Sequence, residues 1–406
     1  MHNLPYDVNI LSPLDRWCVH SYYSICPYAP DKSGRVLVSG TDLDTHKTYV
    51  YIVSSKGEVL AAIENSIAES NFYHTGCWQT WSSDAKSVYY QGGTMEQPLI
   101  YRYDIESGKT VSIKGDMEGA PPFNEPIVSG FLGMLYAAGY ADGNYYPEKA
   151  PIPFGDRDSH GLFSFDITKN EQKLLLSVND ILKIHPEREK LINLEKEYIK
   201  TSGNLEGYTL MAYCVRWNPK GDRCLFYFGN HCVDSKRKEP KLCYVFTANR
   251  DFSDISLALD LSFDHPGVHW SWHPDGIHLV GYACHPDNDM KMCLCSVKYD
   301  GTDFKVISRN SSGGHASISP ADYNLLVVDN FEPKGRIAFI DLETDTEIGH
   351  YTLPREYGTV IPPGRNPYRV CHHPVFSPDG KKIIINFLPD KNSVVAELDV
   401  IERKND

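Results

Sequence analysis

The sequence has no long apolar run and no excess of positive charge. Its 406 residues include 40 Lys and Arg against 53 Asp and Glu, which gives a net charge of −13. A membrane-spanning helix needs about 20 consecutive apolar residues, so we expect no membrane partner. Nucleic-acid binding requires a basic surface, so nucleic acid is not expected as the main partner either. An anionic sugar is compatible with this charge where local cations or a metal face it.

A secretion signal and a disulfide framework are also missing. Residues 1–5 include no cluster of positive charge, and no apolar segment follows them. The 11 cysteines are odd in number and scattered, mostly within strand-like segments, whereas a secreted disulfide scaffold uses an even number at regular spacings. We therefore expect a cytoplasmic chain whose thiols are free, buried or bound to metal. The sequence leaves the oligomeric state open.

A repeated strand–turn–strand unit is the main feature that the sequence does contain. Each unit has an apolar strand, a turn with Pro, Asp, Gly or Ser, a second strand and, in most units, two more strands. Seven such units follow one another with a period of about 40–50 residues, which is typical of β-propeller blades. The clearest turns are at residues 30–31, 82–84, 218–221, 274–276, 320–322 and 378–380. The pattern predicts an all-β, seven-bladed β-propeller that forms a single domain over residues 1–406.

The first and last units are expected to share one segment of chain. Unit one is predicted to begin its first strand at Ser24, while unit seven offers only three strands, at residues 373–377, 382–387 and 394–400. We expect residues 9–23 to supply the missing strand of unit seven. Closing the ring in this way removes an edge that would otherwise invite aggregation.

Two parts of the middle of the chain depart from the pattern. Unit three is less regular, with strands expected at 127–132, 134–140, 161–166 and 172–177 and a long insertion at 142–159. Residues 179–200 are predicted to form a short helical insertion between blades three and four. Pro186 suits a first helical position, and apolar residues then recur at helical spacing.

A histidine occupies the same position in three of the units. His269, His315 and His373 each lie five residues before the turn proline. The same offset gives three further residues: Cys214, Trp78 and Ile25. The first strand of a propeller blade lines the central channel, so one offset corresponds to one height on the channel wall. We therefore expect the three histidines to form an arc on adjacent blades, flanked by Cys214.

This arc predicts a divalent metal site. Imidazole is the commonest borderline metal ligand, and several that converge from separate strands make a usable site. Side chains alternate along a strand, so Cys371 and His373 share one face while His372 points to the other. A thiolate ligand favours zinc. The predicted ligands are His315, His373, Cys371 and His269; a metal-free histidine cluster is the alternative.

The repeated turns, the register of the three histidines and the histidine-rich segment before the last Pro-Asp turn resemble the oligogalacturonate lyase family of seven-bladed propellers. In that family a Mn²⁺-type metal in the channel mouth binds a uronate carboxylate, and the enzyme eliminates across C4–C5 of a short uronic-acid oligosaccharide. The resemblance implies the same fold, an anionic oligosaccharide substrate and a Mn²⁺-type cofactor. Together with the thiolate of Cys371, which favours zinc, this gives Mn²⁺ or Zn²⁺ as the predicted cofactor. It also implies that His315 and His373 bind the metal and that His269 is an active-site histidine.

The chain departs from the family pattern at several positions. The last-blade motif of the family, Gln-x-x-His-Pro-His-Pro, falls on residues 368–374. Tyr368 therefore stands at the Gln position and Cys371 at one His position. The family's fourth-blade histidine is replaced by Cys214, and its catalytic arginine has no secure match; Lys241 is nearest. A lyase for another uronate, such as ulvan, is the first alternative.

β-Elimination needs a base for the C5 proton and positive charge against the neighbouring carboxylate. The candidates for the base are His231, Lys241, Arg216 and His74. Arg216 and Arg369 each lie two residues from a cysteine of the predicted site, so either suits a bidentate clamp on the carboxylate. The other candidates for substrate contact are His269, Tyr368 and Arg157.

Two other classes of protein are weighed against the lyase. A non-catalytic propeller that serves as a binding scaffold is the main alternative to an enzyme. A glycoside hydrolase needs paired carboxylates, and no such pair stands in register on the predicted channel strands, so it ranks last.

Overall fold

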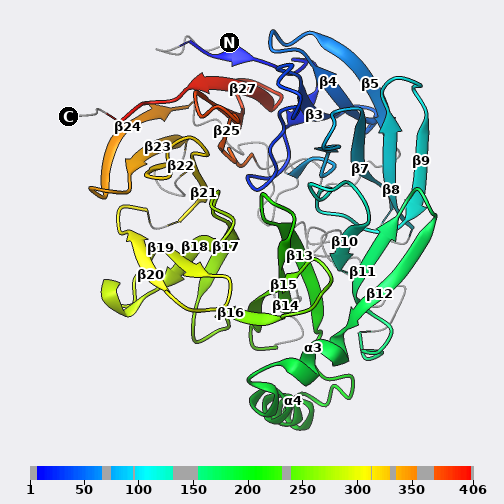
Figure 1. The fold of residues 1–406 in the computed structure, drawn as a ribbon, viewed down its shortest axis with the longest axis vertical. Coiled ribbons are helices and arrows are strands. Elements are labelled where there is room, and N and C mark those ends of the chain that lie inside the picture. Colours follow the sequence, from blue (N-terminus) through cyan, green and yellow to red (C-terminus); the bar gives the residue numbers. More distant parts are fainter. Residues whose placement is uncertain are drawn as a thin grey trace.

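The computed structural model describes residues 7–65, 75–94, 97–130, 154–230, 239–311, 313–329, 335–353 and 370–403. Their strands form seven sheets, of which six have four strands and one has three. Figure 1 shows these sheets arranged in a ring around a central axis. The prediction of an all-β, seven-bladed β-propeller is therefore confirmed.

Five blades are each built from four strands that follow one another in the chain and pair as antiparallel neighbours. Blade one consists of β2 (Trp17–Val19), β3 (Val36–Thr41), β4 (Thr48–Val53) and β5 (Val59–Asn65). Blade two consists of β6 (Thr80–Trp81), β7 (Ser87–Gly93), β8 (Pro98–Asp104) and β9 (Thr110–Lys114). Blade four consists of β13 (Met211–Trp217), β14 (Arg223–Gly229), β15 (Cys243–Asn249) and β16 (Ser256–Asp260). Blade five consists of β17 (Gly267–Trp272), β18 (His278–Cys284), β19 (Met292–Lys298) and β20 (Lys305–Ser308), with a short 3-10 helix, η3 (Pro286–Asn288). Blade six consists of β21 (His315–Ile318), β22 (Leu325–Asp329), β23 (Arg336–Asp341) and β24 (Thr346–Thr352).

The cores lie between neighbouring blades because the middle strands are buried on both faces. β14 is buried along its whole length, whereas the outer strand β24 has no fully buried residue. One core cluster joins Leu225 and Val245 of blade four to Trp270 and Cys295 of blade five. Full burial of a large apolar side chain stabilises a fold by about 1.5–3 kcal/mol. Packing between blades therefore holds the inner strands in place around the channel.

Blade seven draws strands from both ends of the chain. It contains β25 (Val375–Phe376), β26 (Lys382–Phe387), β27 (Val394–Asp399) and β1 (Asn9–Ile10). β1 pairs with β27, with Asn9 opposite Glu397. Figure 1 shows this blue strand beside the red one. The outer strand of the last blade thus comes from the N-terminal segment.

The inner strand of blade one begins earlier than predicted. The sequence pattern placed it after Ser24, but the strand that pairs with β3 is β2, seven residues upstream. Beyond Ser24, the contact with β3 is a single bridge between Tyr28 and Val36. The chain between β2 and Tyr28 instead runs beside the histidines, so this stretch is used for contacts in the channel rather than for a continuous strand.

Blade three also differs from the prediction. It contains β10 (Ile127–Gly130), β11 (Gly161–Asp166) and β12 (Glu171–Ser177), in that order. β10 pairs directly with β11, and residues 134–140, where the sequence predicts a further strand, lie outside the described residues. Leu162, Phe163 and Phe165 of β11 are buried in the core of this blade. Most of the predicted insertion at 142–159 lies outside the described residues.

Two α-helices, α3 (Val178–Ile184) and α4 (Arg188–Ser202), follow β12 and precede β13. Ser177 and Asp180 form a capping box at the start of α3. Pro186 lies in the break between the two helices, because a proline disrupts helical hydrogen bonding. The helix predicted at 179–200 is therefore two helices. Neither they nor any other helix in the described part of the chain combines the length and the apolar character that a membrane crossing requires.

Candidate metal centre

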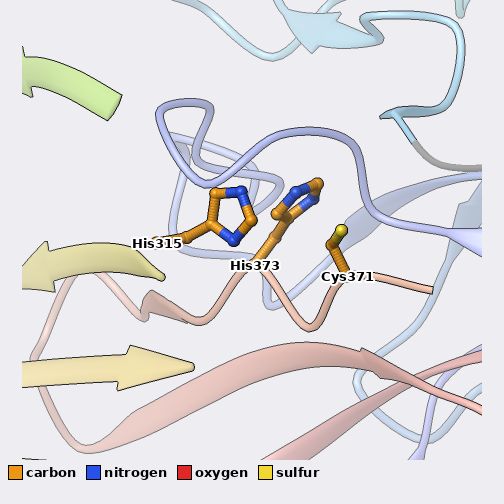
Figure 2. Close-up of side chains that lie close together, drawn as sticks. All are labelled: His315, Cys371 and His373. Atoms are coloured by element: carbon orange, nitrogen blue, oxygen red, sulfur yellow. The ribbon is translucent and has the colours of Figure 1, made fainter. Parts of the chain in front are cut away.

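Three histidines from blades five, six and seven meet at the channel. The ring centroids of His269 and His315 are 4.3 Å apart, and those of His315 and His373 are also 4.3 Å apart. The ligand atoms of His315, Cys371 and His373 all lie within 4.8 Å of one another. Figure 2 shows the two imidazoles next to each other, with the Cys371 thiol beside His373. The structure thus brings these predicted ligands together.

A left-handed backbone marks the same position in four blades. Trp78, Cys214, His269 and His373 have φ values of 53°, 54°, 60° and 46°. Such values are uncommon for residues other than glycine and cost of order 1–3 kcal/mol each. In β13 and β17 this residue lies where the strand register shifts, and a bulge of this kind redirects a side chain. The shared offset in the sequence therefore corresponds to a shared and costly backbone geometry.

Asp329, at the end of β22, holds two of the histidines. Its Oδ1 accepts hydrogen bonds from the His315 backbone N at 2.5 Å and from His315 Nδ1 at 3.0 Å. Its Oδ2 accepts from the His373 backbone N at 3.0 Å. Burial alone would raise the pKa of Asp329, but His315 and His372 hold that pKa below its ordinary value. Asp329 was not predicted, and a carboxylate behind a histidine is a common support for a metal ligand.

Each of the three histidines directs its Nδ1 to an oxygen of the protein. His315 Nδ1 meets Asp329, His373 Nδ1 lies 3.0 Å from the Ser21 carbonyl oxygen, and His269 Nδ1 lies 2.6 Å from that of Gly314. A carbonyl oxygen can only accept a hydrogen bond, so Nδ1 of His373 and of His269 carries the proton. In the neutral rings Nε2 is then the nitrogen with the lone pair, as metal ligation requires.

Two tyrosines from the segment after β2 pack on the histidines. The Tyr22 ring lies 4.8 Å from the His373 ring, and the Tyr23 ring lies 5.3 Å from the His315 ring. The Tyr23 hydroxyl donates to the His269 carbonyl oxygen at 2.6 Å. Sequence reasoning missed both residues, because it placed them at the end of a strand. The adjacent pair of tyrosines beside His20 is the only local signal.

Two further histidines, His20 and His372, lie in this region, and the His20 ring packs edge-on against the His373 ring at 6.5 Å. The His20 backbone N donates to Asn386 Oδ1, and His372 Nδ1 donates to the Asn386 carbonyl oxygen. Burial lowers the pKa of His20 to about 4 and also lowers that of His372. The strand alternation predicted that His372 would point away from His373. Both rings therefore help to form the neutral packing behind the site.

Arg216 contacts blade five and the segment that packs on the histidines. It lies over the rings of Tyr22 and Tyr23, at 5.3 Å and 5.7 Å. It also donates to the Trp270 carbonyl oxygen and to the Tyr23 hydroxyl. These contacts use the cation to secure the segment that packs on the histidines.

Arg157 is paired with a glutamate and a carbonyl oxygen of the protein. Its guanidinium pairs with both carboxylate oxygens of Glu195 in α4 and donates to the Tyr208 carbonyl oxygen. The predicted substrate contact is replaced by a structural ion pair, because the carboxylate of α4 lies within reach. Lys241 is half-buried, with Nζ 3.5 Å from the Gly267 carbonyl oxygen. His74, His231, Tyr368 and Arg369 lie outside the described residues.

The donor set of the site is two imidazole nitrogens and one thiol. A set of this kind suits Zn²⁺, which takes nitrogen and sulfur ligands and leaves a fourth position open in catalytic sites. Mn²⁺ prefers oxygen ligands. His269 and Cys214 flank the group but do not belong to the set of ligand atoms within 4.8 Å.

Comparison with known proteins agrees with the fold. An oligogalacturonate lyase in complex with manganese has a TM-score of 0.64 and 14% identity, over 99% of this chain and 95% of its own. The oligogalacturonate lyase of Vibrio parahaemolyticus has a TM-score of 0.65 and 13% identity over the same shares. Kuenenia stuttgartiensis hydrazine synthase reaches 0.51 with 10% identity, over 99% of both chains. No protein-family model and no curated protein sequence matches the chain. At these identities the likeness establishes the propeller fold alone.

Proposed function

We propose that this chain is a metal-dependent lyase that cleaves uronic-acid oligosaccharides, such as oligogalacturonates, by β-elimination. One observation carries the proposal: the ligand atoms of His315, Cys371 and His373 converge within 4.8 Å at the channel. The fold shared with a manganese-bound oligogalacturonate lyase supports it. The product would be an unsaturated uronate, and the expected compartment is the cytoplasm.

The roles of the described residues follow from their contacts. Bound Mn²⁺ or Zn²⁺ would supply positive charge next to the uronate carboxylate, which makes the C5 proton more acidic. Asp329 and the Ser21 carbonyl oxygen orient the two histidine ligands through Nδ1. The Cys371 thiol adds a soft ligand, and we therefore favour Zn²⁺.

Removal of the C5 proton requires a base within hydrogen-bonding distance. Among the described residues, His269 suits this role best. Its Nδ1 is held by the Gly314 carbonyl oxygen, so Nε2 carries the lone pair, and its ring stacks beside His315. Lys241, Arg216, His74 and His231 stay candidates for the base or acid, and Tyr368 and Arg369 for contacts with the sugar.

The test is release of unsaturated product, measured by ultraviolet absorbance. Purified protein with added Mn²⁺ or Zn²⁺ is assayed on oligogalacturonates and on ulvan oligosaccharides, so that the two uronate classes are compared directly. His315→Ala and His373→Ala should abolish release. His350→Ala, which changes an exposed histidine on the outer strand β24, is the matched control and should leave it unchanged. Absence of product from every uronate with either metal would rule out the lyase.

A second candidate is a non-catalytic propeller that holds a structural metal. The observation in its favour is burial, since His315 is 4% exposed and His373 is fully buried. A structural zinc site is closed and stabilises the fold directly. Stoichiometric metal together with metal-dependent thermal stability, but no product from any uronate, would favour this function.

A further inference from the structure

A cavity of about 680 Å³ occupies the other end of the channel from the candidate metal centre. Turn residues of five blades line it: Pro30, Pro219, Pro274, Pro320 and Pro378. His269, His315 and His373 precede the turns of their own blades by five residues. Tyr23 lines the cavity and also contacts His269 and His315, so it separates the cavity from the histidines. The volume lies within the range of about 300–1,000 Å³ that is typical of ligand sites.

A second row of side chains lies in the channel between the histidines and these turns. Each member follows the position shared by the histidines by two residues, and each lines the cavity: Thr80, Arg216, Ser271, Ser317 and Val375. All but Val375 carry a polar group. The inner end of the cavity, next to the histidines, is therefore polar.

The wall nearer the turns is largely apolar and aromatic. Trp217 and Trp272 belong to it, each one residue beyond a member of the second row. The Trp272 indole is held by a hydrogen bond from Nε1 to the Arg216 carbonyl oxygen at 2.8 Å. Indole rings offer a large apolar area, and they attract other rings in stacked or edge-on arrangements. This wall thus suits a ligand with a ring-containing body.

Arg216 supplies positive charge at the polar end. The hydrogen bonds that its guanidinium makes to described residues, to the Tyr23 hydroxyl and the Trp270 carbonyl oxygen, both come from Nη1. Nε and Nη2 make none to the described residues, and neither is among the buried atoms that lack a partner, so both keep accessible surface. Arg216 as a whole is half-buried and lines the cavity. The edge of a guanidinium that carries Nε and Nη2 matches the two oxygens of a carboxylate.

Ser271 and Ser317 add hydroxyl groups from the next two blades. Ser271 follows Trp270, whose carbonyl oxygen accepts from Arg216, so it lies close to the guanidinium. Both serines are half-buried and line the cavity. Neither hydroxyl bonds to another described residue, and neither is a buried atom without a partner. A hydroxyl can donate to an oxygen of a ligand, so an oxyanion in front of Arg216 has further donors at hand.

No ionised carboxylate offsets Arg216 among the described residues that line the cavity. Glu118 is the one carboxyl among them. Burial raises its pKa to about 8, so it is mainly uncharged near neutral pH. Lys32, exposed at the rim, adds a second positive charge. A buried charge without a partner is costly, and an anionic ligand would supply the missing charge.

We propose that this cavity binds a small organic acid, a single carboxylate carried on an apolar, ring-containing body. The carboxylate accepts from Nε and Nη2 of Arg216 and from the Ser271 hydroxyl. The rings pack against the wall to which Trp217 and Trp272 belong. The proposal does not depend on lyase activity, because the candidate metal ligands lie on the far side of Tyr23 and binding is measured directly.

Three probes with one body and different head groups test it: diphenylpropanoate, diphenylpropanol and diphenylpropylamine. Binding is measured by calorimetry with a chelator present, so that no metal at the histidines can hold the carboxylate. We expect the acid to bind with one-to-one stoichiometry and at least about tenfold more tightly than the alcohol, because charge-assisted hydrogen bonds are the stronger ones. A tenfold difference corresponds to about 1.4 kcal/mol. The amine should bind most weakly, since its ammonium group would face Arg216.

Four variants locate the site. Arg216→Met keeps an unbranched apolar side chain and should remove the preference for the acid, whereas Lys32→Gln, which removes the exposed cation, should change acid binding by less than about threefold, because water and salt screen that charge. Ser317→Phe should block all three probes by filling the cavity. Cys371→Ala, at the candidate metal centre, should bind the acid as the parent protein does.

Near-ultraviolet circular dichroism checks that each variant folds. If Arg216→Met does not fold, the order of the three probes on the parent protein decides. The proposal is wrong if the acid does not bind, if the alcohol binds equally well or the amine most tightly, or if folded Arg216→Met keeps the preference for the acid. It is also wrong if Lys32→Gln or Cys371→Ala abolishes acid binding, or if Ser317→Phe leaves it unchanged.

Discussion

Replacement of Asp329 by asparagine tests how the candidate metal ligands are held. The carboxylate accepts from three donors, the backbone N and Nδ1 of His315 and the backbone N of His373, at 2.5–3.0 Å. Asparagine has one accepting oxygen and one NH₂ group that can only donate. Whichever way its amide turns, the NH₂ group faces a backbone N–H of His315 or of His373.

The expected loss of stability follows from the backbone N–H that is left without an acceptor. One buried backbone N–H without an acceptor costs about 1–3 kcal/mol, and the remaining hydrogen bonds lose the extra strength, roughly 1 kcal/mol, that a charged acceptor provides. We therefore expect Asp329→Asn to lower the free energy of unfolding by about 2–4 kcal/mol. Loss of such a support typically lowers metal affinity by about 10–100-fold, and we expect the same here for Zn²⁺.

Unfolding by urea, followed by circular dichroism, measures the first effect, and calorimetric titration with Zn²⁺ measures the second. Asp303→Asn is the matched control, since that carboxylate is half-exposed and pairs only with surface groups. It should change stability by less than about 0.5 kcal/mol. If Asp329→Asn behaves like the control in both measurements, Asp329 does not position the histidines.

Three further predictions concern the ring, the histidine strand and pH. Leu11→Ala should lower the free energy of unfolding in urea by about 2–5 kcal/mol, because Leu11 is fully buried between blades one and seven. Leu14→Ala changes a side chain that is 52% exposed and should lower it little. Equal losses in the two variants would contradict closure of the ring by this segment. Gly314→Ala should weaken Zn²⁺ binding by shifting His315, because Gly314 has a φ of 113° and a Cβ there would overlap the Asp329 carbonyl oxygen. Gly203→Ala is the control: Gly203 has a φ of 71° and faces open space, so this change should lower stability by only about 1 kcal/mol and leave Zn²⁺ binding unchanged. Unchanged metal binding in both variants would count against the site geometry. Burial raises the pKa of Glu118 from 4.5 to about 8, so between these pH values the folded chain keeps a proton that the unfolded chain releases. The free energy of unfolding of the parent, relative to that of Glu118→Gln, should therefore fall by up to about 1.4 kcal/mol per pH unit as the pH rises. Parallel pH profiles of the two proteins would show that Glu118 is not buried as described.

The repeats and the histidine offset could be predicted because their signals are local. A turn rich in Pro, Asp and Gly recurs in most blades, and the offset of five residues from the turn selects one backbone position. The structure gives that position a left-handed φ in His269 and His373. Residues 371–374 are not part of a strand and His373 has a left-handed φ of 46°, so strand alternation does not account for the placement of Cys371 and His373.

The supports of the site could not be predicted, because they depend on pairing between distant residues. Asp329 reaches His315 through the pairing of β21 with β22 and reaches His373 across blades, over 44 residues of chain. Tyr22 and Tyr23 come from a segment that sequence reasoning assigned to a strand. The packing of Arg216 on the tyrosine rings and its hydrogen bond to the Trp270 carbonyl oxygen also join residues that are far apart in the sequence. Only the three-dimensional arrangement shows which polar groups are already committed.

The most direct test of the central claim is a single experiment on metal-depleted protein. Oligogalacturonate is added, Zn²⁺ or Mn²⁺ is titrated in, and the ultraviolet absorbance of unsaturated product is followed alongside the bound metal. The account predicts that product release rises in step with one equivalent of metal and that His373→Ala loses both. Full metal binding without product from any uronate, or release that is independent of metal and of His373, would contradict it.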